Sequence, residues 1–249
     1  MLHQRIIIAA GTFLLLGCLG ADCKARTPQN AKLDSQERPR KATGILLDRI
    51  PKSKRNQWES IRSIVFATAP NGNAIYPSLK QLWDRVDSSG HTLYVEFATA
   101  RGVTTNTAGS FQLEHFDSTG QRHIGVLRLY LHVIDRAYIG KNVARGNGFV
   151  PFEGLSTDER YVEVLGHELA HVVAIFSNLE RARQVDQLIV PTNEMFYADH
   201  AKKPNSPLGA DLEHRINLRD RLLDELEVDA DAAEETVWRE LITVRRQRR

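Results

Sequence analysis

The chain has 249 residues, 42% of them hydrophobic, and a formal net charge of +2. This length and apolar content suffice for one domain with a buried core, and the nearly balanced charge gives no general attraction for nucleic acid. Its two cysteines, Cys18 and Cys23, lie close to the N-terminus. The remainder of the sequence therefore excludes disulfides and cysteine-bound metals, and a metal there would need His, Asp or Glu ligands.

The first residues are typical of an export signal. Arg5 precedes an apolar run from Ile6 to Leu16, which is short for a permanent membrane anchor but suits a signal peptide. The run leads into Gly17-Cys18, which resembles the bacterial lipobox, where a small residue precedes a cysteine that becomes lipidated. We expect residues 1–17 to be removed and Cys18 to hold the protein in the periplasm or at the outer membrane. The alternative is a soluble secreted protein.

Residues 18–56 are expected to form a flexible tether. They are rich in Lys, Arg, Gln, Pro and Ser, a composition that buries too little apolar surface to fold. Leu46 and Leu47 are the exception, because this apolar pair could form an ordered patch. The folded domain is expected to span residues 57–249.

The hydrophobic periodicity changes along this domain and predicts its elements. Apolar residues at three-to-four spacing predict helices, alternating ones predict strands, and Gly-rich or Ser-rich segments predict turns. The expected helices are 58–69, 77–86, 156–176, 179–189 and 210–244, and the expected strands are 91–98, 110–117 and 123–134. Strands followed by helices indicate an α+β fold with a small mixed or antiparallel sheet.

One helix carries a pattern suited to metal chemistry. Ser156 and Glu159 predict a capping box at its start, and further along it His167 and His171 stand four residues apart. Residues at this spacing share a helix face, so both imidazoles can bind one ion. Glu168 follows the first histidine and can accept the proton of a zinc-activated water. The alternative is a pair of surface histidines, but the apolar residues around them favour a buried site.

The segment Val164–Val173, VLGHELAHVV, resembles the active-site helix of the zincin metallopeptidases. The resemblance implies zinc, hydrolysis of peptide bonds and Glu168 as general base. It also implies a zincin-like fold, in which this helix packs on a sheet whose edge strand binds the peptide substrate. The strand Val126–Ile134 is our candidate for that edge.

The third ligand is expected from the last helix. The metzincin pattern would need Gly and His where this chain has Ala174 and Ser177. The gluzincin form, Glu-x-x-x-Asp, occurs twice in DELEVDADAAEE, beginning at Glu225 and at Glu227. At 100° per residue, Glu227 lies about 80° from the centre of the apolar stripe and Glu225 about 120°.

We therefore favour Glu227 as the ligand, with Asp231 orienting a ligand histidine. Glu225 and Glu234 remain alternatives for the third ligand. Tyr197 and His200 are candidates for stabilising the transition state, a role that zincins often give to a Tyr or His.

Two functions remain open from the sequence. The first is a zinc metallopeptidase acting on peptides or proteins, with no nucleic acid partner and with membrane contact only through Cys18. The second is a zincin-like envelope protein that binds metal or a protein partner without turnover. Glu168 favours the enzyme, because a scaffold does not need that carboxylate.

Overall fold

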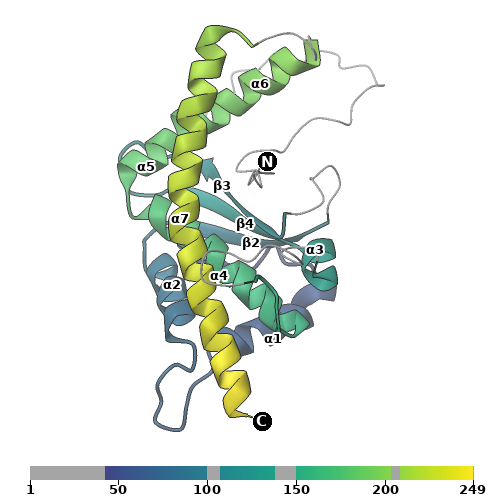
Figure 1. The fold of residues 1–249 in the computed structure, drawn as a ribbon. Coiled ribbons are helices and arrows are strands. Elements are labelled where there is room, and N and C mark those ends of the chain that lie inside the picture. Colours follow the sequence, from purple (N-terminus) through teal and green to yellow (C-terminus); the bar gives the residue numbers. More distant parts are fainter. Residues whose placement is uncertain (1–42, 100–106, 138–149, 203–207, 249) are drawn as a thin grey trace.

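The computed structural model describes residues 43–99, 107–137, 150–202 and 208–248. These residues form a four-stranded sheet and a group of helices, of which the last is much the longest (Figure 1). In chain order the elements are β1 (Gly44–Leu46), a 3-10 turn (Lys52–Lys54), α1 (Arg55–Val65), α2 (Pro77–Asp87), β2 (Thr92–Ala98), β3 (Gly109–His115), β4 (Ile124–Tyr130), α3 (Leu131–Arg136), α4 (Thr157–Phe176), α5 (Leu179–Gln184), a π-helical segment η2 (Val185–Ile189), α6 (Val190–Lys202) and α7 (Ala210–Gln247).

The sheet is mixed, with strand order β1-β2-β4-β3. Strands β1, β2 and β4 are parallel to one another, whereas β3 runs antiparallel to β4 along one edge. This arrangement confirms the expected combination of a small mixed sheet with helices, with α4 packed on the sheet and further helices after it. Among the described helices, none is long and apolar enough to cross a membrane.

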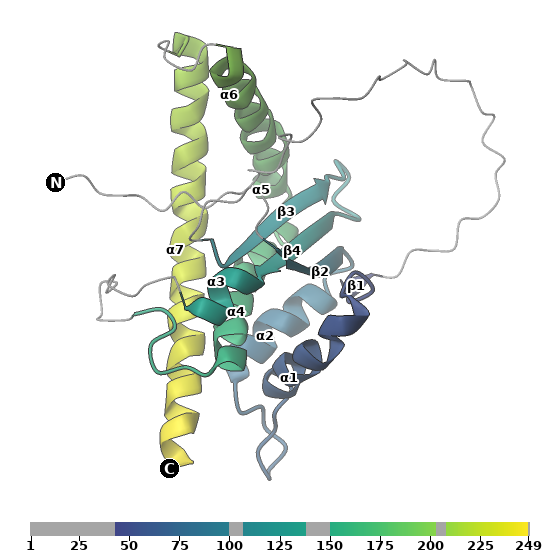
Figure 2. The same cartoon turned by 90° about the vertical axis from the view of Figure 1, so that its right-hand side faces the viewer.

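Helix α4 is the central element of the fold. It packs against β3 and β4 on one side and against α7 on another, with α1 and α2 beside it (Figure 2). The predicted capping box is present: the backbone N–H of Ser156 donates to Glu159, and the backbone N–H of Glu159 donates to the Ser156 hydroxyl. Because residues from Tyr161 to Val173 are buried all round the helix, polar groups within that stretch are held away from bulk water.

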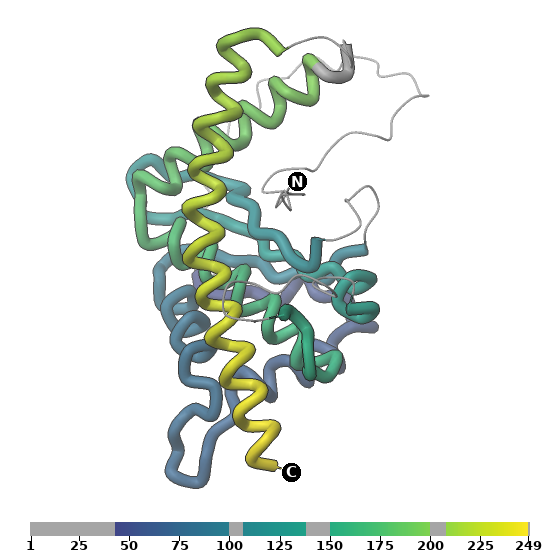
Figure 3. Tube along the Cα trace, viewed as in Figure 1, coloured from purple at the N-terminus to yellow at the C-terminus, as the bar shows by residue number. Residues whose placement is uncertain are grey.

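Helix α7 crosses α4 at close range, as the trace in Figure 3 also shows. The contact is close because Gly166 has no side chain, and a Cβ added there would lie 2.9 Å from Cγ2 of Val237. The apolar stripe of α7 that faces the core includes Leu222, Leu226 and Ala230. This packing fixes the rotation of α7 about its axis, and hence which of its carboxylates face α4.

Two expectations need correction. The tether was expected to reach residue 56, but Gly44–Leu46 pairs with β2 and α1 begins at Arg55. The apolar residues of this segment gain a partner in the sheet, which outweighs the polar composition around them. The rest of the expected tether, residues 18–42, lies outside the described residues.

The edge strand was also assigned wrongly. The expected edge, Val126–Ile134, ends as a strand at Tyr130, and β4 lies between β2 and β3 in the interior of the sheet. Val126 and Leu127 point to opposite faces and are both fully buried, as is typical of an interior strand. The edge nearest the histidine helix is β3, in which exposed or half-buried polar residues follow buried ones.

Candidate metal centre

The two histidines of α4 meet as the spacing predicted. The Nε2 atoms of His167 and His171 are 3.1 Å apart, and both side chains are buried. One helical turn separates them, so the rigid backbone of α4 sets their relative position. Because the two imidazole nitrogens converge on one point, they could supply two of the three ligands of a metal site.

Helix α7 supplies a carboxylate to the same point. Glu227 Oε1 lies 3.1 Å from Nε2 of His171, and its Oε2 lies 3.5 Å from Nε2 of His167. Glu225 is exposed, as its angle from the apolar stripe indicated. His167, His171 and Glu227 therefore form a cluster that could hold a metal ion.

The electrostatics of this cluster favour a positive charge. Burial alone would lower the pKa of His167, but the neighbouring carboxylates of Glu227 and Glu234 outweigh it and raise that pKa well above its ordinary value. Burial would raise the pKa of Glu227, yet its hydrogen bonds to His167 and His171 lower it to about 2. A divalent cation would satisfy the same groups, since it supplies positive charge to the carboxylate and needs neutral imidazole as ligand.

Glu168 lies beside the cluster rather than in it. It is buried, and the charges of His167, His171 and Glu227 all act on it. Burial is the main reason that its pKa rises to about 7. Its Oε2 has no hydrogen-bond partner among the described residues, so this oxygen is available to a small molecule that enters the site.

The position of Glu168 depends on a glycine in the edge strand. A Cβ added to Gly109 would lie 2.6 Å from Oε1 and 2.7 Å from Cγ of Glu168, distances at which one of the two must move. Sequence reasoning missed Gly109. The available signal was a glycine beside a strand pattern, which often marks the close approach of another group.

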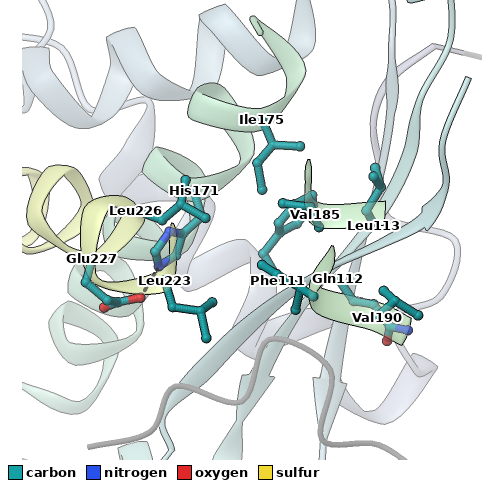
Figure 4. A pocket seen from close by; sticks show the side chains of 11 residues that line it. Phe111, Gln112, Leu113, His171, Ile175, Val185, Val190, Leu223, Leu226 and Glu227 are labelled. Atoms are coloured by element: carbon teal, nitrogen blue, oxygen red, sulfur yellow. Dashed lines mark ion pairs between the residues drawn. The ribbon is translucent and has the colours of Figure 1, made fainter. Parts of the chain in front are cut away.

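An apolar pocket opens beside the cluster. Figure 4 shows His171 and Glu227 at one side of it and residues of β3 across from them. The π-helical segment η2 and the start of α6 complete the wall, and such segments occur frequently at functional sites. Besides His171 and Glu227, the lining residues are Phe111, Gln112, Leu113, Ile175, Val185, Ile189, Val190, Leu223 and Leu226.

The other predicted residues fall into three groups. Asp231 Oδ1 is 3.8 Å from Nδ1 of His167, so it approaches the imidazole as expected, but its side chain is 41% exposed. Tyr197 is exposed on α6 and is not among the described residues that line the pocket. The side chain of His200, and Cys18 with the whole N-terminal leader, lie outside the described residues.

No protein-family model, curated protein or solved structure matches the chain.

Proposed function

We propose that the protein is a zinc-dependent hydrolase of peptide bonds. The observation that carries the proposal is the convergence of His167, His171 and Glu227, from two helices, beside a buried carboxylate that is not itself part of the cluster. Two histidines, one glutamate and an open fourth position form a donor set that zinc uses in catalytic sites.

The spacing of the donor atoms supports zinc. Ligands about 2.0–2.1 Å from a tetrahedral ion lie roughly 3.3 Å from one another. The two Nε2 atoms are 3.1 Å apart, and Glu227 reaches them through different oxygens, with Oε1 3.1 Å from His171 and Oε2 3.5 Å from His167. These distances are close to the spacing of zinc ligands, and a rotation of the Glu227 carboxylate would bring one oxygen to the ion together with both imidazoles.

The reaction follows from the roles that these residues can play. Zinc, when bound, would lower the pKa of a coordinated water and polarise the carbonyl group that the water attacks. Glu168 would accept the proton of the attacking water and would then return that proton to the departing amine. The buried walls around it exclude other water, which strengthens electrostatic interactions within the site.

The surroundings of the cluster favour an extended peptide as substrate. Strand β3 is one of the two edges of the described sheet and lies beside α4, and an extended peptide can pair with such an edge. The neighbouring pocket is lined mainly by aliphatic and aromatic side chains, and it would accept an apolar substrate side chain. The peptide would then cross the fourth position of the metal cluster.

The proposal is tested with the full chain, produced with its N-terminal segment. The purified protein is stripped of metal, reloaded with zinc, and incubated with a peptide library whose products are identified by mass spectrometry. We expect cleavage only with the zinc-loaded protein, and cleavage sites next to apolar residues. If the protein binds a stoichiometric amount of zinc but cleaves no peptide, the proposed hydrolase activity is contradicted and the metal-binding scaffold is favoured.

Gly109→Ala tests the link between the edge strand and the proposed base. The added methyl group would meet Glu168 and Val164, and no metal ligand is among its three nearest atoms. The Glu168 carboxylate should therefore move while zinc remains bound. A displacement of about 1 Å in a catalytic group can cost on the order of 10²-fold in rate, and we expect a loss of this size in kcat. Gly209→Ala is the matched control, because nothing lies within 4 Å of a Cβ there. Equal kcat in the two variants would contradict the role of Gly109.

We further propose that the protein acts outside the cytoplasm, anchored by a lipid on Cys18. Support comes from the apolar run that ends at Gly17-Cys18. The mass of the mature N-terminal peptide tests this proposal, since an unmodified terminus beyond Cys23 would rule out the anchor.

A further inference from the structure

The second ring nitrogen of His167, Nδ1, is a buried polar atom near the metal centre that needs a hydrogen-bond partner. Its Nδ1 is buried and has no hydrogen bond of normal geometry within the described residues. If Nε2 binds a metal, the neutral ring carries its proton on Nδ1. A buried N–H without an acceptor costs about 1–3 kcal/mol, so an acceptor for this proton would stabilise the metal-bound form.

Two carboxylates of α7 approach this nitrogen. Glu234 Oε2 is 3.4 Å from Nδ1, whereas Asp231 Oδ1 is 3.8 Å away. Their exposure differs more than their distance, because the Glu234 side chain is 7% exposed and the Asp231 side chain is 41% exposed. Water screens the charge of Asp231 and competes for its oxygens, whereas the charge of Glu234 acts through the protein interior.

Helical geometry explains why Glu234 reaches the histidine. Glu227 and Glu234 are seven residues apart, which is close to two turns of α7, so they lie on one face. The imidazole of His167 stands between them, with Nε2 towards Glu227 and Nδ1 towards Glu234. One helix therefore provides both the carboxylate that would share the ion and a carboxylate on the opposite side of the ring.

We infer that Glu234 is the positioning residue of the metal centre. It accepts the Nδ1 proton of His167, fixes the tautomer that leaves Nε2 free for the ion, and holds the plane of the ring towards Glu227. The inference rests on the zinc site of the proposed function. It gives Glu234 the role that the Glu-x-x-x-Asp frame had suggested for Asp231.

The test measures zinc affinity, so it does not depend on turnover. Glu234→Ala, Glu234→Gln and Asp231→Asn are titrated with zinc against a competing chelator, and the melting temperature of each metal-free protein is recorded. Glu235→Gln is the control, because Glu235 is the adjacent carboxylate and pairs with Arg239 instead. Partners of ligand histidines typically contribute about 10–100-fold to metal affinity.

We expect Glu234→Ala to weaken zinc binding by about 10–100-fold. Glu234→Gln should weaken it less, because the amide oxygen still accepts the proton, and this partial rescue is what a merely structural role would not produce. Asp231→Asn and Glu235→Gln should remain within about twofold of the wild type. Substitution of cobalt for zinc should show a shifted visible absorption spectrum only in the Glu234 variants.

Three outcomes would overturn the inference. If both Glu234 variants bind zinc as tightly as the wild type, or if Asp231→Asn weakens zinc binding instead, Glu234 does not position His167, and the proposed hydrolase still stands. If the wild type binds no zinc, the inference and the proposed function fail together. Should Glu234→Ala not fold, the nearly isosteric Glu234→Gln decides between these results.

Discussion

Replacing Glu168 with Gln is expected to leave the fold and the zinc in place and to reduce hydrolysis by at least about 10²–10⁴-fold, the usual contribution of a general base. The amide has nearly the volume of the carboxylate, so the close packing against Gly109 is preserved. Glu168 is not a member of the metal cluster, so zinc content should not change. The amide cannot accept the proton of the attacking water, and kcat falls for that reason.

The measurement compares kcat, zinc content and melting temperature for the wild type and Glu168→Gln. Glu225→Gln is the matched control, since it makes the same chemical change at an exposed position of α7, and it should behave as the wild type. Hydrolysis that continues unchanged in Glu168→Gln would show that another group takes the proton. Loss of zinc from this variant would instead mean that the carboxylate is a ligand.

The second large effect is expected at the third ligand. Glu227→Ala should weaken zinc binding by more than the roughly 100-fold seen when only a partner of a ligand is lost, because two imidazoles then remain from α4. Glu225→Ala removes a carboxylate two residues earlier on the same helix, and it should bind zinc as the wild type does. Metal analysis after dialysis against a chelator measures both variants.

Loss of zinc from Glu225→Ala but not from Glu227→Ala would show that Glu225, and not Glu227, is the third ligand. Such a result would require α7 to rotate by about 200° relative to the described structure, at 100° per residue. That rotation would also expose Leu222 and Leu226, which are buried.

The sequence predicted the parts of the site that depend on one helix at a time. The capping box places the start of α4, the four-residue spacing places His167 and His171 on one face, and the apolar stripe of α7 selects Glu227 over Glu225. Each of these inferences uses only the 3.6-residue period. The distances between these residues and the exposure of Glu225 agree with them.

Features that depend on contacts between elements could not be predicted in this way. Strand periodicity does not reveal strand order, so an apolar run fits an edge or an interior position equally well, and the edge was assigned to Val126–Ile134 instead of β3. The contact of Gly109 with Glu168 joins residues of different elements. The preference of His167 for Glu234 over Asp231 depends on how deeply each carboxylate is buried, which the spacing along α7 does not determine.

The crossing of α4 by α7 has a consequence for biosynthesis. The two histidines are translated before Glu227, and the carboxylate that completes the proposed centre belongs to a helix that must pack on α4 first. Folding tends to follow the order of synthesis, so the earlier part of the chain would form with only two of the three ligands. A polypeptide still emerging from the ribosome, or one cut upstream of α7, would thus be inert. The proposed centre would therefore be complete only once α7 has packed on α4.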